Sequence, residues 1–180
     1  EKVFDKIILQ KHQEFGFNFL YAFRHFNMFI NSLFLAIKYK KLSKIKRYIY
    51  FPLHVPNDVS LTLRCPEFTN QLALIDFLAR NIPESYSLVI KEHPAQIGAL
   101  SYKKISEILK RYDHISIIDP LTNNFDVIEK AEALICINSK SGAEAIITST
   151  PVLVLGSAFY TNSKFVNFTS DLYEINGILK

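Results

Sequence analysis

The sequence contains no tryptophan, only two cysteines and only five glycines in 180 residues. Cys65 and Cys136 have neither a metal-ligand spacing nor a disulfide framework, which suits a reducing cytoplasm. Neither a G-x-G-x-x-G nor a Walker sequence occurs, and this argues against dinucleotide- and ATP-binding sites of those kinds. No acidic D-x-D cluster is present to hold a metal ion. The sequence therefore predicts no metal site and no cofactor.

The chain also shows neither a start methionine nor a signal peptide, and from this we expect an excised or truncated domain. Apolar residues make up 49% and charged residues 21%, a balance typical of a globular protein of about one domain. A net charge of +4 fits an anionic ligand, an anionic membrane surface or nucleic acid. Because no RNA-binding motif or recognition helix accompanies the basic residues, nucleic acid is not an expected partner.

The amino-terminal segment, from Glu1 to about Tyr39, is rich in Phe, Ile and Leu and predicts two helices with a break near Gly16 or Asn18. Its polar residues argue against a membrane span, so we expect it to pack on the sheet or on a domain outside this chain. The run Lys38–Arg47 carries six basic residues in ten positions. It reads either as a solvated helix end or as a contact with anionic lipid head groups, which leaves peripheral contact with the inner membrane open.

From Tyr48 onward, short apolar runs alternate with amphipathic stretches, which predicts a parallel sheet of about five strands covered by helices on both faces. The expected strands are Tyr48–Phe51, Ser87–Lys91, Ile115–Ile118, Ala133–Ile137 and Val152–Leu155. The expected helices are Phe68–Asn81, Tyr102–Tyr112, Asn124–Ala131 and one that begins near Ser141.

The turn between Ile137 and Ala143 is the first candidate site. Ser141 and Glu144 fit an S-x-x-E capping box at the start of a helix. Gly142 would let a ligand approach the backbone, where free N–H groups and the helix dipole favour a phosphate. The turn is thus either an anion cradle or an ordinary capped helix.

Ligands bind outside the carboxyl ends of the strands in an open parallel sheet, and the residues that follow each strand should share one rim. These sets are Pro52–His54, Glu92–Pro94, Asp119–Pro120, Asn138–Ser139 and Gly156–Ser157. Two histidines, acids and hydroxyl groups around one crevice favour a nucleotide.

The rim segments YFPLHVPND, CPEF, VIKEHP, CINSKSGAEA and TPVLVLGSAFY also carry a family resemblance. Together, over about residues 47–160, they resemble the carboxyl-terminal half of bacterial capsular polysaccharide biosynthesis glycosyltransferases, the family that contains the Kdo transferases. The resemblance implies one Rossmann-like half of a GT-B fold at residues 47–180, with residues 1–46 as a helical interdomain or packing segment. The implied activity is sugar transfer from a nucleotide-linked donor, CMP-linked and Kdo-like, to a glycan or glycolipid acceptor at the cytoplasmic side of the membrane.

Residue by residue, the resemblance implies that His93, with Pro94 fixing its loop, contacts the nucleotide or its phosphate and is the catalytic candidate. It implies that Asn138, Ser139, Ser141 and Gly142 hold the phosphate at the helix start. Glu144 would either reach the ribose hydroxyls or cap the helix. His54 is a further candidate for donor or acceptor contact, and His93 has the alternative of a purely structural rim histidine.

Three functions stay open at this point. The first is glycosyl transfer, in which His93 and the helix start stabilise charge on the leaving phosphate, a cationic His93 is able to donate a proton, and the acceptor's base lies outside this chain. The second is a UDP-sugar epimerase of GT-B architecture. The third is a non-catalytic nucleotide-sugar-binding or scaffolding domain that docks on a membrane or on an assembly complex through its first 47 residues.

Overall fold

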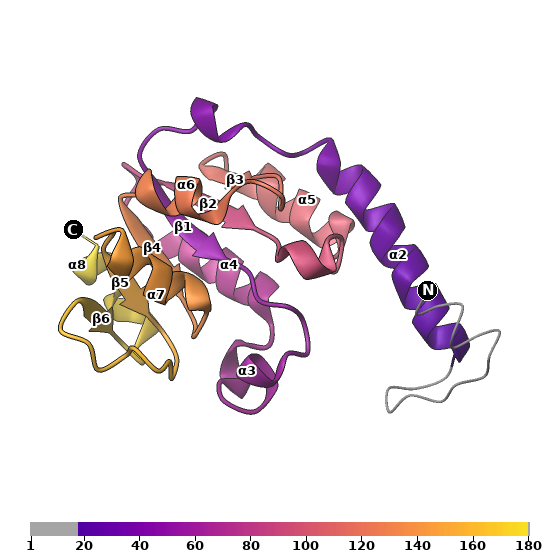
Figure 1. Ribbon diagram of the computed structural model, residues 1–180. Coiled ribbons are helices and arrows are strands. Elements are labelled where there is room, and N and C mark those ends of the chain that lie inside the picture. The colour runs from indigo at the N-terminus through magenta and orange to yellow at the C-terminus, as the bar shows by residue number, and fades with distance from the viewer. Residues whose placement is uncertain (1–17, 180) are drawn as a thin grey trace.

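A six-stranded, all-parallel sheet forms the centre of the protein (Figure 1). The computed structural model describes residues 18–179. The strand order is β3-β2-β1-β4-β5-β6, so the chain builds outward from β1 in one direction and then from β4 in the other. The switch point of this doubly wound sheet lies between β1 and β4, where ligands of such sheets bind. The strands are β1 (Tyr48–Pro52), β2 (Ser87–Lys91), β3 (Ile115–Ile117), β4 (Ala133–Cys136), β5 (Val152–Val154) and β6 (Val166–Phe168).

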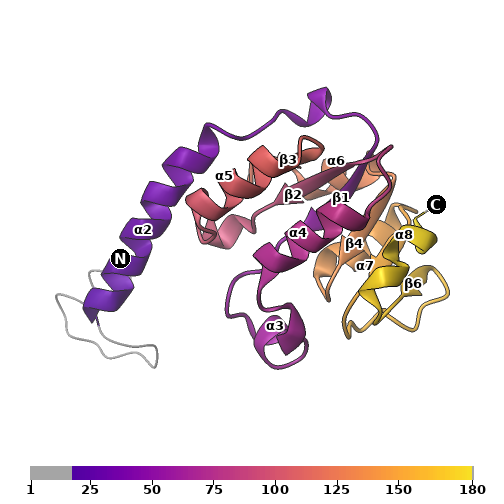
Figure 2. The same cartoon turned by 180° about the vertical axis from the view of Figure 1, so that it is seen from behind.

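Helices cover both faces of the sheet because successive strand residues point to opposite sides. In β1, Ile49 and Phe51 join the core under α4 and α5, whereas Tyr48 and Tyr50 join the core under α6 and α7. Figures 1 and 2 show these two layers from opposite sides. The helices are α2 (Asn18–Ala36), α3 (Val59–Thr62), α4 (Gln71–Asn81), α5 (Tyr102–Arg111), α6 (Asn124–Glu129), α7 (Lys140–Ile147) and α8 (Ile175–Ile178).

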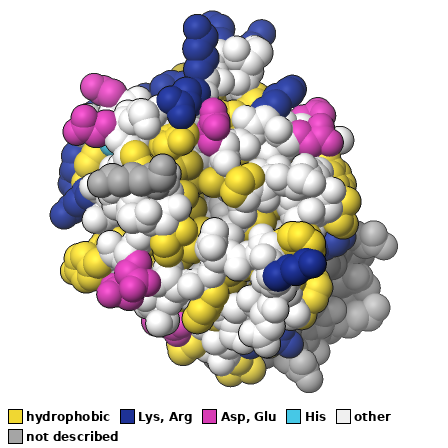
Figure 3. Space-filling view, turned by 90° about the vertical axis from the view of Figure 1, so that its left-hand side faces the viewer, with side chains coloured by type: hydrophobic (Ala, Val, Ile, Leu, Met, Phe, Trp, Pro, Cys, Tyr) yellow, Lys and Arg dark blue, Asp and Glu magenta, His cyan; other side chains and the backbone are white. Residues whose placement is uncertain are grey.

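The sixth strand, β6, was not predicted. It has only three residues and pairs with β5 at the edge of the sheet, where Asn167 and Phe168 are exposed. A strand this short, with one face toward solvent, lacks the continuous apolar run that identified the other strands. Figure 3 looks at this end of the molecule and shows hydrophobic side chains in small groups among polar ones, with Lys and Arg side chains gathered at the top.

Of the two packing partners expected for the amino-terminal helix, the sheet and a domain outside this chain, the sheet is not the one that α2 covers. It contacts α5 and the loop that joins β2 to α5, and it extends away from the sheet (Figure 1). Asn31 fixes the contact, since its amide donates to the Gly98 carbonyl at 3.2 Å and accepts from the Tyr102 N–H at 3.2 Å. Gly98 has φ +77°, and a Cβ there would collide with the Met28 carbonyl, so this close approach requires glycine.

The other amino-terminal expectations have mixed outcomes. The predicted break near Gly16 lies outside the described residues, and α2 begins at Asn18. The basic run Lys38–Arg47 is not a helix end, because α2 stops at Ala36 and the run forms an exposed connection with one 3-10 turn, Leu42–Lys44. Within residues 18–179, no helix combines the length and the apolar character that a membrane crossing needs.

Candidate functional site

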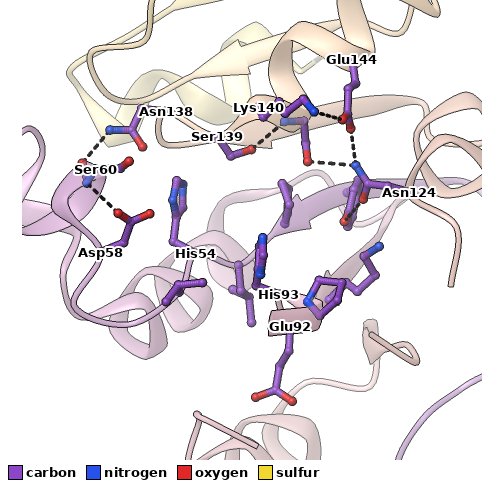
Figure 4. A pocket seen from close by; sticks show the side chains of 17 residues that line it. His54, Asp58, Ser60, Glu92, His93, Asn124, Asn138, Ser139, Lys140 and Glu144 are labelled. Carbon is purple, nitrogen blue, oxygen red and sulfur yellow. Dashed lines mark hydrogen bonds and ion pairs between the residues drawn. The ribbon is translucent and has the colours of Figure 1, made fainter. Parts of the chain in front are cut away.

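A cavity of about 470 Å³ opens at the carboxyl ends of β1, β2 and β4 (Figure 4). Three of the five predicted rim sets line it, namely those after β1, β2 and β4. The sets Asp119–Pro120 and Gly156–Ser157 do not, so the expectation of one shared rim was wrong for them. The β3 side instead contributes Asn124 from the first turn of α6. The cavity therefore sits at the switch point that the strand order defines.

At the turn between β4 and α7 the N-cap lies two residues earlier than the predicted capping box places it. Ser139, not Ser141, is the N-cap, and its hydroxyl oxygen accepts from the Ser141 N–H at 3.1 Å. The carbonyl of Ser139 accepts from the Gly142 N–H at 3.1 Å and from the Tyr160 hydroxyl. Two N–H groups of the first turn are thus already bonded within the protein, which leaves a smaller backbone cradle for an anion than the sequence suggested.

Gly142 does not serve the approach of a ligand. It is buried, it does not line the cavity, and a Cβ built on it would overlap the hydroxyl and ring of Tyr160, with Cζ only 2.5 Å away. Tyr160 packs here because its hydroxyl bonds to Ser139 and lies 3.4 Å from the Cys136 sulfur. Glycine is needed so that this tyrosine can support the turn from behind, a contact with a partner 18 positions further along the chain that spacing alone does not reveal.

Glu144 does not cap the helix. Its Oε2 accepts from the Asn124 side-chain amide at 2.6 Å, and its Oε1 lies 3.9 Å from the Lys140 ammonium. Asn124 also donates to the Ser141 hydroxyl at 3.0 Å and accepts from the Tyr50 hydroxyl at 2.8 Å. The carboxylate consequently lines the cavity (Figure 4), so the competition between capping and ligand contact is settled against capping.

In the K-E-H-P segment, the Glu92 side chain supports the fold and the His93 side chain points into the cavity. Glu92 is buried and points away from the cavity (Figure 4), where it accepts from the N–H groups of Gly98 and Leu100. His93 extends into the cavity, and its Nδ1 accepts from the Ala95 N–H at 3.1 Å. An uncharged His93 with this bond carries its proton on Nε2. Nε2 is therefore the ring nitrogen left to donate a hydrogen bond, while Pro94 begins the 3-10 turn that presents the ring.

His54 is held by its backbone. Gln71 accepts from the His54 N–H at 2.7 Å and donates to the His54 carbonyl at 3.0 Å. The side chain is buried, and within the described residues its Nε2 has no hydrogen-bond partner. Burial lowers the pKa of His54, with nearby His93 acting in the same direction and Asp58 opposing it. The His54 ring therefore lines the cavity with one ring nitrogen unpartnered.

Asn138 provides a second open atom. Its amide donates to the Ser60 carbonyl at 2.7 Å and to the Cys65 sulfur at 3.3 Å, which ties the α3 segment to the end of β4. Its Oδ1 is buried, and no partner for it occurs in the part of the chain that the structure describes. Buried polar atoms are almost always hydrogen-bonded in native proteins, so two unpartnered atoms on residues that line one cavity favour a ligand-binding site there.

The cavity thus unites seven of the eight predicted site residues, and Gly142 is the one that stays behind it. Sequence reasoning missed Asn124, Lys91, Tyr50, Asp58 and Ser60. Lys91 was predictable from the sequence, because it directly precedes Glu92-His93-Pro94 at the end of a predicted strand. The position of Asn124 depends on how the β3–α6 loop returns over the sheet, which the sequence does not show.

Fold and cavity define a Rossmann-like domain with a polar pocket at its switch point. The chain belongs to the family of capsule polysaccharide biosynthesis proteins, whose family model matches residues 8–165. The family resemblance predicted from the sequence is therefore confirmed.

Two curated relatives illustrate the extent of the match. The capsule polysaccharide modification protein LipB of Neisseria meningitidis serogroup A is 27% identical over 146 residues, which are 76% of this chain and 34% of LipB. The protein FixF of Sinorhizobium fredii is 29% identical over 136 residues, which are 73% of this chain and 32% of FixF. The chain spans about a third of the length of these relatives.

Solved structures confirm the predicted fold class. The Thermosulfurimonas dismutans KpsC β-Kdo 2,7-transferase aligns with a TM-score of 0.53 at 20% identity, over 92% of this chain and 49% of that one. The Methanocaldococcus jannaschii UDP-GlcNAc 2-epimerase, in complex with UDP-GlcNAc and UDP, aligns with a TM-score of 0.50 at 17% identity, over 87% and 44%. At these identities the likeness concerns the fold, which is one Rossmann-like half of a GT-B-like architecture.

Proposed function

We propose that this chain is the donor-binding domain of a glycosyltransferase that uses a nucleotide-activated acidic sugar, CMP-linked and Kdo-like, in capsule or surface polysaccharide synthesis. The observation that carries the proposal is the cavity itself, in which His54, His93, Asn138, Ser139 and Glu144 converge from separate elements at the switch point. Family membership and the KpsC fold likeness support the choice of reaction.

Each side chain has a role in this proposal that its geometry supports. The Nε2–H of His93 donates to the phosphate of the nucleotide, and the start of α7 adds the positive end of its dipole. The carboxylate of Glu144, held in place by Asn124, accepts from the ribose hydroxyls.

The chemistry follows from where charge develops. As the glycosidic bond breaks, negative charge grows on the departing nucleotide phosphate, and fixed donors around that phosphate stabilise the transition state more than the ground state. His93 donates through Nε2, because its Nδ1 already accepts from the Ala95 N–H. The base that deprotonates the acceptor hydroxyl belongs, in this proposal, to a part of the enzyme outside this chain.

The test is a thermal-shift titration with CMP, UDP, ADP and NAD on the parent protein, His93→Ala and Ser141→Ala. A ligand that binds only the folded state raises its stability with concentration, so millimolar nucleotide reveals even a weak site. We expect CMP to give the largest shift and both substitutions to reduce it. His25→Ala and Ser157→Ala are matched controls, because both residues are exposed and lie outside the cavity.

Other results would redirect the assignment. A preference for UDP would favour the epimerase, whose fold the chain shares. No shift with any nucleotide would contradict the proposal and favour a docking domain that works through α2, where Phe23, Phe26 and Phe29 are exposed.

A further inference from the structure

Lys91 is a buried lysine that lines the cavity. It is the last residue of β2, pairs in register with Pro52 of β1, and its residue surface is only 5% exposed. Removing an ammonium group from water is costly unless the charge is paired and its hydrogen bonds are satisfied. The groups around its Nζ should therefore explain why a lysine occupies this buried position.

The hydrogen bonds of Lys91 are incomplete. Nζ donates to the Thr122 carbonyl at 2.9 Å, although an ammonium group has three N–H donors. Among the described residues, no carboxylate lies within 4.0 Å of it. Burial lowers the pKa of Lys91, while the more distant Glu144 and Asp119 oppose this shift. Glu144 itself is already engaged by Asn124 and Lys140.

A purely structural role explains these contacts poorly. One bond to a neutral carbonyl does not need a full charge, and a methionine of similar length would pack in the same space at lower cost. The adjoining acid, Glu92, is turned away and bonded to two backbone N–H groups, so it does not neutralise Lys91. Lys91, which lines the cavity at the end of β2, is thus a desolvated cation with unused donors.

We propose that the Lys91 ammonium binds an oxyanion of the donor, either the nucleotide phosphate or the carboxylate of an acidic sugar. The inference rests on the proposed function, since it names a binding residue of the same cavity. Charged hydrogen bonds are worth about 1.5–3 kcal/mol, so removal of the charge should weaken binding of that anion about 10- to 100-fold.

The experiment compares the parent protein with Lys91→Met and Lys91→Gln. Methionine keeps the length and removes the charge, and glutamine retains a donor for the Thr122 carbonyl, so at least one variant should fold. Lys140→Met is the matched control, because Lys140 also lines the cavity but is exposed. Dissociation constants are measured by calorimetry for three probes: cytidine, which has no anion; CMP, which adds the phosphate; and free Kdo, which has a carboxylate.

The outcomes separate the two oxyanions. Loss of CMP affinity in both Lys91 variants, with cytidine unchanged, identifies the phosphate as the partner. Loss of Kdo affinity with CMP unchanged identifies the carboxylate. Both results also require Lys140→Met to have a smaller effect than Lys91→Met.

The inference is overturned if the parent and the Lys91 variants bind CMP and Kdo equally well, and in that case the proposed function still stands. It is also overturned if the variants lose cytidine to the same degree as CMP, because that pattern indicates damage to the cavity. A parent protein that binds none of the three probes contradicts the proposed function itself.

Discussion

The two walls of the cavity differ in how fully their polar groups are bonded. We call Ser139, Ser141, Asn124 and Glu144 the fastened wall, because they are linked to one another, to Tyr50 and, through Ser139, to Tyr160. We call His54, Lys91 and Asn138 the open wall, because buried or partly buried polar atoms there lack partners or have unused donors.

The difference indicates a division of labour. A wall whose polar groups are hydrogen-bonded to one another is rigid and holds its side chains in place. Buried polar atoms without partners keep their desolvation penalty, which a ligand that bonds to them would remove. The sequence drew attention to the β4–α7 turn, but among the described residues the unsatisfied polar groups of the cavity lie largely at the ends of β1 and β2. We expect substitutions in the fastened wall to reduce stability, and substitutions in the open wall to affect binding more than stability.

The largest stability effect should come from Gly142→Ala. The new methyl group would overlap the ring of Tyr160, whose hydroxyl is anchored at Ser139. Overpacking of this kind costs about 1–3 kcal/mol. Urea denaturation should show the loss as a lower midpoint with an unchanged slope.

Gly177→Ala is the control for this prediction, because nothing lies within 4 Å of a Cβ at that position in α8. The double variant Gly142→Ala/Tyr160→Ala should cost less than the sum of the two single changes, since the clash is gone. Strict additivity would show that Tyr160 is not the obstacle.

Sequence reasoning found the architecture of this protein because buried parallel strands leave continuous apolar runs. Each of the five expected strands is present within a residue or two, and only the exposed edge strand β6 was missed. Helix α4 illustrates the limit at element ends, since Pro66–Phe68 forms a separate 3-10 turn and the helix begins after Asn70 instead of at Phe68.

The residues of the candidate site were predictable only where the order of the strands determines which residues meet. His54, His93 and Asn138 follow strands that lie side by side at the switch point, so their convergence follows from the parallel sheet. The role of Gly142 depends on Tyr160, and the role of Glu144 depends on Asn124. Such contacts between distant positions have no signature in local spacing, and for that reason a capping box was predicted where a different cap exists.

A smaller effect should separate the two serines of the turn. Ser139→Ala removes the observed N-cap of α7 and should cost about 1 kcal/mol, a typical value for the loss of a serine cap. Ser141→Ala keeps that cap and removes only an acceptor for Asn124, so it should cost less. Thermal unfolding of both variants in parallel decides the order. An equal or larger loss for Ser141→Ala would restore the predicted capping box and contradict the observed cap.

The smallest effect concerns the open wall and depends on pH. Because burial lowers the pKa of His54 below its ordinary value of about 6.5, the unfolded chain binds more protons than the folded protein between the two pKa values. Stability should therefore fall as pH decreases below about 6.5, and His54→Gln should make this decline shallower. His25→Gln is the control for the loss of a histidine as such, since His25 is exposed on α2 and lies outside the cavity. Urea midpoints measured from pH 5 to 8 test this, and identical slopes for the parent and His54→Gln would show that His54 is not desolvated.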